Sequence, residues 1–215
     1  MVASLRSIPY RGWLFLIIVA VVVLLGIDPY HHGDYLLEHS PTLALLIYLS
    51  FFDRKWTLSN TSATLIFIFL LLHALGAHYL YSRVPYDAWV RGIFGTDITT
   101  TFGFERNHYD RLVHFCFGIL MVYPMREVVS KYLRLGPIAG LVIAVAFLAV
   151  GSKLYELAEW LIALLMDPEA AERYNGQQGD MFDAHKDMAL ALTGSLISAT
   201  YLALREKRRP TPLAA

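Results

Sequence analysis

The sequence predicts an all-α, polytopic membrane helix bundle with about six transmembrane helices and both termini in the cytoplasm. Of its 215 residues, 56% are hydrophobic and only 17% are charged, a more apolar composition than that of an ordinary soluble domain. Long apolar segments recur, and a helix that rises about 1.5 Å per residue needs roughly 20 of them to cross the hydrocarbon core. These observations exclude a soluble globular class and predict a single transmembrane domain over residues 1–215.

We expect the membrane spans at residues 13–27, 41–52, 58–81, 111–129, 137–166 and 184–204. The second is short and has the weakest support. The first follows Arg6 and Arg11 and has the length of a secretory signal, but no small-x-small cleavage site occurs at residues 24–29. We therefore interpret it as a retained helix. The lone Cys116 lies inside the fourth span and cannot form an internal disulfide,.

The distribution of charge predicts the orientation. Eleven of the 18 basic residues and three of the 18 acidic ones fall at the ends of the chain and in alternate connections. The other seven basic and fifteen acidic residues fall on the opposite side. Because basic residues accumulate on the cytoplasmic side, both termini are expected there, and the neutral net charge hides a strong asymmetry. Residues 206–215 form a basic cytoplasmic tail. We expect residues 82–110 to form a structured outer loop, with a partly re-entrant or interfacial segment,.

Ionisable side chains concentrate in the outer half of this arrangement, where all eight histidines fall. If the fourth helix begins near Asn107, then Asn107, Asp110 and His114 share one face,. Asp110 and His114 can then converge on one ligand. Arg106 and Arg111 lie beside them in the sequence, and the alternative role for these arginines is to neutralise nearby acids.

The fifth span carries Glu156 and Glu159 in its outer half. Two carboxylates three residues apart are neighbours on a helix and repel unless they are protonated, paired or bridged by a cation. An ion pair of Lys153 with Glu156 is the alternative interpretation, but it leaves Glu159 unexplained. The pattern does not decide which of the two glutamates faces the site.

The last span is entered through three aspartates that share one face, Asp180, Asp183 and Asp187,. The first two also suit ordinary capping of the helix N-terminus. Ala191 and Gly194 continue this face as small residues suited to close helix packing,. On the third span His78 and His73 are five residues apart and cannot point at one spot. We expect His78, which is nearer the outer end, to belong to the site.

Four motifs together resemble those of the YjdF-like family of bacterial inner-membrane proteins, whose function is unknown. They are Gly-Ala-His-Tyr at 76–79 followed by Val-Pro at 84–85, Glu-Arg-Asn-His-Tyr-Asp-Arg at 105–111 with His114, Tyr-Glu-Leu-Ala-Glu-Trp at 155–160, and Gly-Asp at 179–180 with Asp183 and Asp-Met at 187–188. The resemblance covers most of the chain from the second span onward. It implies a multi-pass protein of the bacterial inner (cytoplasmic) membrane and supplies no activity or ligand set.

An excess of buried acid must be protonated, hydrated or matched by a cation. With histidines beside carboxylates, the sequence favours a divalent metal, zinc first and manganese or iron next. We expect metal ligands among His78, His114, Asp183 and Asp187, catalytic carboxylates among Glu159, Asp110 and Glu156, and substrate-binding groups among Arg106, Arg111, Asn107 and His108.

The first functional hypothesis is a metal-dependent membrane hydrolase or transferase that acts on a lipid or lipid-linked substrate at the outer face. Its partners would be membrane lipids, with no nucleic acid. The second is a proton- or cation-coupled transporter that uses the same acids. The third is a non-enzymatic scaffold in which the charges form a structural lattice of ion pairs.

Overall fold

The computed structural model describes residues 8–44, 47 and 58–208, and this part of the chain contains helices and loops with no strand. The all-α prediction is therefore confirmed. The helices are α1 (Tyr10–Leu25), α2 (His32–Glu38), α4 (Asn60–Tyr79), α5 (Tyr86–Phe94), α6 (Ile98–Phe102), α7 (Tyr109–Leu133), α8 (Pro137–Ala163), α9 (Pro168–Asn175) and α10 (Asp183–Lys207).

Four described helices, α4, α7, α8 and α10, are long and apolar enough to cross a membrane. Helix α1 is also apolar but has only 16 residues, which makes it shorter than a typical spanning helix of roughly 20. Most of the expected span 41–52 lies outside the described residues. The fourth span was expected at 111–129, but α7 runs from Tyr109 to Leu133 because its polar first and last turns are also helical.

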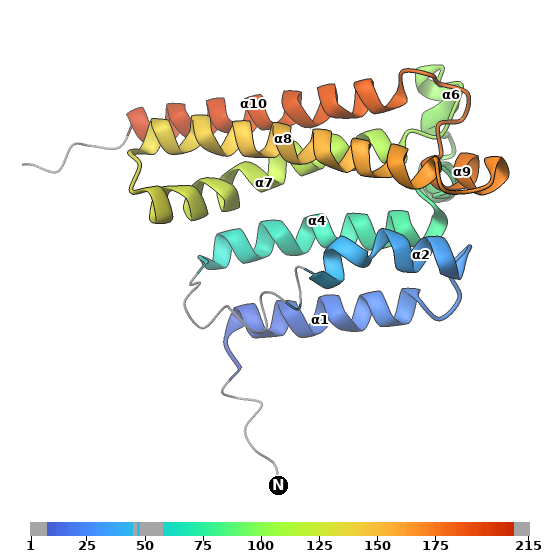
Figure 1. The fold of residues 1–215 in the computed structure, drawn as a ribbon, viewed down its shortest axis with the longest axis horizontal. Coiled ribbons are helices and arrows are strands. Elements are labelled where there is room, and N and C mark those ends of the chain that lie inside the picture. Colours follow the sequence, from blue (N-terminus) through green and yellow to red (C-terminus); the bar gives the residue numbers. More distant parts are fainter. Residues whose placement is uncertain (1–7, 45–46, 48–57, 209–215) are drawn as a thin grey trace, which may run out of the picture.

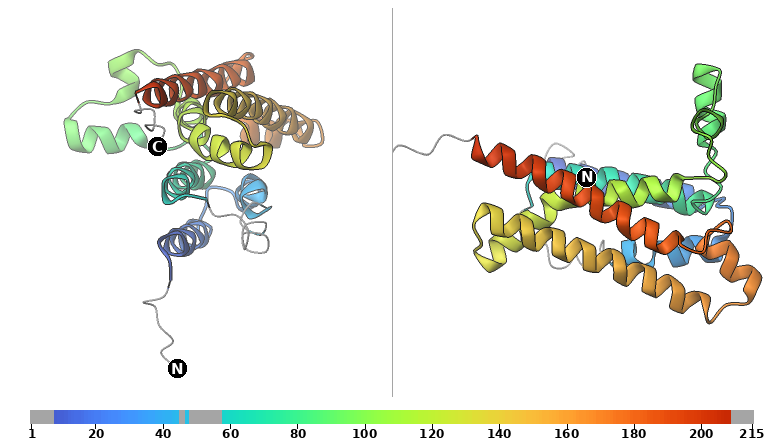
Figure 2. Two further views of the ribbon diagram at one scale, coloured as in Figure 1. Left: turned by 90° about the vertical axis from the view of Figure 1, so that its left-hand side faces the viewer. Right: turned by 90° about the horizontal axis from the view of Figure 1, so that it is seen from above.

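Helices α7, α8 and α10 pack together, α4 packs against α7, and α1 packs against α4 (Figure 1). Val122 of α7, Leu141 and Leu148 of α8, and Leu202 of α10 form the core of the first three helices. The short helices α2, α5, α6 and α9 lie at one end of the bundle (Figures 1 and 2). We call this the loop end; α4 ends there, and α7 and α10 begin there.

Helices α7 and α10 cross at two glycines. A Cβ atom on Gly118 would lie 2.1 Å from the carbonyl oxygen of Ala191, and one on Gly194 would lie 2.4 Å from that of Phe115. The backbones therefore approach more closely than any side chain permits. This confirms that Ala191 and Gly194 mark a close helix contact, and it fixes the register of α7 against α10 at the loop end.

Helix α2 is held against the bundle by hydrogen bonds of its own side chains. Asp34 is buried and accepts a 2.8 Å hydrogen bond from Nε of Arg173 on α9. The hydroxyl of Tyr35 donates to the carbonyl oxygen of Val22 at 2.5 Å. Since a buried charge is tolerated only when it is paired, these contacts hold α2 in one place over the spanning helices.

Candidate functional site

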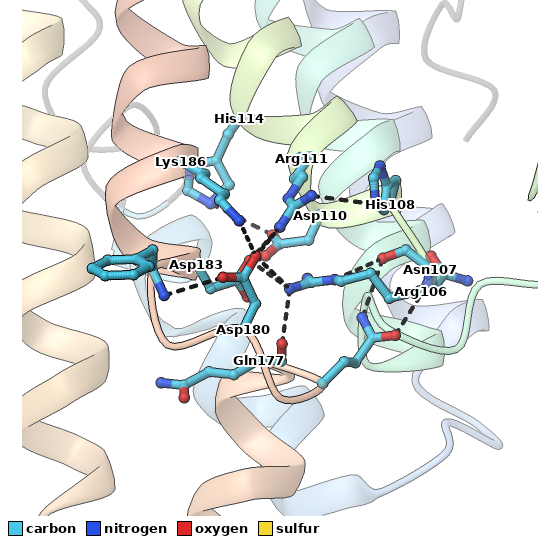
Figure 3. A network of polar contacts seen from close by, with 12 residues as sticks. Arg106, Asn107, His108, Asp110, Arg111, His114, Gln177, Asp180, Asp183 and Lys186 are labelled. Carbon is cyan, nitrogen blue, oxygen red and sulfur yellow. Dashed lines mark hydrogen bonds and ion pairs between the residues drawn. The ribbon is translucent and has the colours of Figure 1, made fainter. Parts of the chain in front are cut away.

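A cluster of five charged side chains closes the loop end above α7 and α10. We call it the arginine–aspartate cluster; it consists of Arg106, Arg111, Asp180, Asp183 and Lys186 (Figure 3). Nη1 of Arg106 lies 2.6 Å from Oδ1 of Asp183. Arg111 pairs with Asp180, whose Oδ2 also accepts from Nζ of Lys186 at 2.6 Å. The hydrogen bond from Lys186 is the main reason that the pKa of Asp180 is lowered to about 2.

The turn before α7 positions this cluster. The side-chain amide of Asn107 donates to the carbonyl oxygen of Val84 at 2.9 Å, and its Oδ1 accepts from the backbone N–H of Tyr109 at 3.0 Å. Nη1 of Arg106 also donates to the carbonyl oxygen of Gln177 at 2.8 Å. These bonds fold residues 105–108 against the α9–α10 loop. Helix α7 begins at Tyr109, so Asn107 precedes the helix and does not share its face with Asp110 and His114 as predicted.

His108 caps α7 beside the arginines. Its Nε2 lies 3.2 Å from Nη1 of Arg111, and its ring stacks on Phe104. Burial and the neighbouring Arg111 lower the pKa of His108. A neutral His108 is compatible with two guanidinium groups nearby.

Next to the cluster, three side chains bring potential metal ligands to one point. Ligand atoms of Asp110, His114 and Asp187 all lie within 4.8 Å of one another. Asp110 and His114 are one turn apart on α7, and Asp187 comes from the facing turn of α10. We call these three residues the Asp–His–Asp group. The predicted convergence of Asp110 and His114 is therefore present in the structure, and Figure 3 shows the two side chains beside the arginine–aspartate cluster.

Glu156 of α8 adds a fourth ionisable group. Its Oε1 and Oδ1 of Asp110 each lie 3.5 Å from Nε2 of His114. Oε1 of Glu156 and Oδ1 of Asp187 are buried without a hydrogen bond from any described residue. Buried carboxylate oxygens nearly always have a partner. The Asp–His–Asp group and Glu156 therefore have acceptor capacity for a cation or for protons.

A cavity of about 280 Å³ opens beside this group between α2, α4, α7, α8 and α9. Phe69, Leu70, Val113 and Phe117 give it apolar walls. Its polar lining comprises Glu38, Thr42, His73, Tyr81, Ser82, Asp110, His114, Ser152, Tyr155, Glu159, Tyr174 and Asn175. Asp110 and His114, two members of the Asp–His–Asp group, also line the cavity. A molecule in the cavity therefore has access to the group.

Glu38 is a site residue that the sequence analysis missed. It is 4% exposed, lines the cavity, and accepts a 3.0 Å hydrogen bond from the hydroxyl of Tyr155. Burial raises its pKa to about 8. The position of Glu38 four residues after Asp34 is the one sequence signal available, since this spacing places both acids on the same face of a short helix.

The other expected site residues lie in different surroundings. Nδ1 of His78 lies 2.8 Å from the carbonyl oxygen of Leu25, and His78 is not part of the Asp–His–Asp group. Oδ1 of Asp183 forms an ion pair with Arg106 and lies 3.4 Å from Nη2 of Arg111. Of the two glutamates on α8, Glu156 is beside His114, whereas Glu159 lines the cavity.

Comparison with known proteins agrees with this architecture. Residues 10–208 match the family described as "Predicted membrane protein (DUF2238)". The chain is 30% identical over 190 residues to the inner membrane protein YjdF of Escherichia coli (strain K12), covering 87% of this chain and 86% of that protein. No solved structure matches the chain. Since the family match spans nearly all of the helical region, this multi-pass membrane protein belongs to the DUF2238 family, to which the YjdF-like motifs had pointed.

Proposed function

We propose that the protein is a metal-dependent membrane enzyme, a hydrolase or transferase that acts on a lipid or lipid-linked substrate. One observation carries the proposal: Asp110, His114 and Asp187 bring ligand atoms within 4.8 Å of one another, next to a cavity between the helices. A mixed set of one imidazole and two carboxylates suits zinc first and manganese or iron next.

The local balance of charge supports a cation. Asp180 and Asp183 are paired with Arg106, Arg111 and Lys186. The arginine–aspartate cluster therefore leaves Asp110, Asp187 and Glu156 with His114 as their neighbouring base. Burial of unmatched negative charge is costly, and a divalent ion offsets this cost.

The proposed chemistry assigns a role to each group. A metal held by the Asp–His–Asp group would polarise a bound water or a substrate oxygen. Glu156, whose Oε1 lies 3.5 Å from Nε2 of His114 as Oδ1 of Asp110 does, would place a further carboxylate beside the metal. Glu159 and Glu38 line the cavity, where either carboxylate can exchange a proton with the substrate. This division moves Asp110 from the catalytic carboxylates expected from the sequence to the metal ligands, and it retains Glu159 among the catalytic carboxylates.

The arginines support an anionic substrate. Nη2 of Arg106 and Nε of Arg111 are buried without a hydrogen-bond acceptor among the described residues. Guanidinium groups bind phosphate oxygens well. We assign these two N–H groups to the headgroup of the substrate, His108 to the edge of the same site, and Asn107 to holding the turn in place.

A chelation and reconstitution experiment tests this function. Chelator-treated protein in detergent, supplied with zinc or manganese and with phosphatidylglycerol or an isoprenoid diphosphate, should release a water-soluble product that is detectable by mass spectrometry. Asp187→Asn and His114→Ala should abolish the release, whereas Glu105→Gln, which changes an exposed acid outside the group, should not. Full release by the two group variants or after chelation would refute the metal-dependent mechanism.

Cation-coupled transport is the second candidate, because Glu38, Glu159 and Asp110 line one cavity within the bundle. The two candidates differ in what they require. A transporter needs a sealed vesicle and a gradient of protons or of the metal ion, whereas an enzyme acts equally well in detergent. Uptake of manganese or zinc into proteoliposomes that depends on Glu159 would favour transport.

We also propose six spans with both termini on the cytoplasmic side of a bacterial inner membrane. The five described apolar helices, the hydrophobic content of residues 41–52 and the asymmetry of basic residues support this topology,. It places the loop end on the outer side. A reporter that is active only outside the cytoplasm, fused after residue 208, should be inactive, and the same reporter inserted at Gly95 should be active.

A further inference from the structure

Helices α5 and α6 form a side arm at the loop end. We call residues 86–102 the arm. It runs across the long axes of the spanning helices at the loop end and projects beyond them in both views of Figure 2. None of the residues in α5 or α6 is buried. The arm is therefore an element whose exposed surface needs a partner other than the bundle.

The arm exposes four large apolar side chains. Trp89, Ile93 and Phe94 on α5 are 43%, 75% and 72% exposed, and Phe102 at the end of α6 is 69% exposed. Residues 89 and 93 are one helical turn apart and share a face. Side chains of this size are rarely presented together to water without a binding role.

The polar groups of the arm are satisfied within the arm itself. Oδ1 of Asp87 accepts the backbone N–H groups of Ile98 and Thr99, each at 3.0 Å. Arg91 pairs with Asp97 at 2.5 Å, and Asp97 also caps α6 by accepting from the N–H of Thr100 at 2.7 Å. The arm therefore offers a partner apolar contacts and has few unsatisfied polar groups that call for a protein surface.

We infer that the arm lies flat in the membrane interface and inserts Trp89, Ile93, Phe94 and Phe102 among the lipids of the leaflet at the loop end. The spanning helices run along the membrane normal, so an element that crosses their ends lies in the membrane plane. Leu112 in the first turn of α7 and Phe182 just before α10, at the loop end, are 48% and 55% exposed. The apolar surface of the arm thus continues the lipid-facing surface of the spanning helices.

The root of the arm is joined to the turn that carries the arginines. The hydroxyl of Tyr86 accepts a 3.0 Å hydrogen bond from the backbone N–H of His108, and Trp89 packs edge to face on Tyr79 at 6.1 Å. Seating the arm in lipid therefore fixes the position of residues 105–108 relative to the headgroups. Contact of the arm with lipid does not depend on a bound metal.

Spin labelling tests the inference directly. In a Cys116→Ser background, Ile93→Cys places a nitroxide on the apolar face, and Ala88→Cys places one on the same helix but about 140° away. In vesicles of phosphatidylethanolamine and phosphatidylglycerol, the Ile93 label should collide preferentially with oxygen and the Ala88 label with water-soluble nickel chelate. Equal exposure of both labels to the nickel chelate would overturn the inference. Dipolar broadening between Ile93 labels that persists at high lipid dilution would overturn it in favour of a second copy.

A second measurement needs no added cysteine. In a variant with Trp13, Trp56 and Trp160 replaced by Phe, Trp89 is the remaining tryptophan. Because an interfacial helix buries its apolar face about 5–10 Å into the headgroup region, lipids brominated near the carbonyl groups should quench Trp89 more strongly than lipids brominated near the chain ends. Absence of quenching by either lipid would contradict insertion.

Discussion

Nε2 of His114 on α7 lies 3.5 Å from Oε1 of Glu156 on α8. A ligand atom of Asp187 on α10 lies within 4.8 Å of one on the same imidazole, so three spanning helices each bring an ionisable group to one point. Charged groups inside a helix bundle are costly and in general mark functional positions. The position of Glu156 beside His114 therefore marks this point of the bundle as a functional site.

Neutralising Glu156 should weaken metal binding without unfolding the protein. Glu156→Gln retains the size of the side chain but removes the charge beside His114. Loss of a group next to the metal ligands typically changes the affinity about 10–100-fold. Competition for zinc against a fluorescent chelator should show a loss of that order for Glu156→Gln and none for Glu105→Gln, which changes an exposed acid. Equal affinities in the two variants would show that Glu156 does not act on the site.

Breaking the pair of Arg106 and Asp183 should destabilise the loop end. Both side chains are largely buried and lie 2.6 Å apart. Removal of one partner of a buried pair costs about 3–5 kcal/mol because the other charge stays unmatched. Asp183→Asn should therefore lower the thermal unfolding temperature strongly, and the double change Arg106→Leu with Asp183→Leu should recover part of the loss. A double variant less stable than Asp183→Asn would contradict this explanation.

The crossing of α7 and α10 should not tolerate a methyl group. In Gly118→Ala the new Cβ would meet the carbonyl oxygen of Ala191 at 2.1 Å, so the helices must separate or shift. Overpacking of this kind costs about 1–3 kcal/mol. Gly151→Ala on α8 is the matched control, since nothing lies within 4 Å of its added methyl group. The two variants should differ clearly in melting temperature, and equal temperatures would mean that the crossing is looser than described.

Glu38 should make the protein less stable as the pH rises toward 8. Burial raises its folded-state pKa to about 8, whereas a carboxyl in the unfolded chain titrates near about 4.3. Between these values the folded protein binds a proton that the unfolded chain has released, so the free energy of unfolding falls with increasing pH.

Glu38→Gln stays neutral throughout this range and should flatten the decline in melting temperature between about pH 5 and 8. Each kcal/mol corresponds to roughly 2–4 °C for a chain of this size. Glu105→Gln should leave the decline unchanged. A slope that is identical in wild type and Glu38→Gln would contradict a buried, protonated Glu38.

Local patterns were enough to predict part of this architecture. Hydropathy identified the spans that became α4, α7, α8 and α10, because a helix in lipid must be apolar over its length. Helical periodicity brought Asp110 and His114 together, and the small residue Gly194 marked the α7–α10 contact. These features depend on one helix at a time, and helical geometry alone determines them.

Features that depend on how helices are placed against each other were harder to predict. Asp187 meets His114 only through the register that the Gly118 crossing sets, and Glu156 rather than Glu159 faces that imidazole because of the rotation of α8. Glu38 was missed because α2 has only seven residues, too few for periodicity to distinguish a helix from a polar loop. Glu38 is buried because the pair of Asp34 with Arg173 holds α2 against the bundle.

Elemental analysis of the purified, chelator-washed and metal-reloaded protein tests the central claim most directly, with wild type compared with Asp187→Asn. We expect about one zinc, manganese or iron ion per chain in wild type. We expect little or none in Asp187→Asn, in protein that elutes from a sizing column as wild type does. Metal-free wild type after reloading, or an equal metal content in a folded Asp187→Asn variant, would contradict a metal centre at the Asp–His–Asp group.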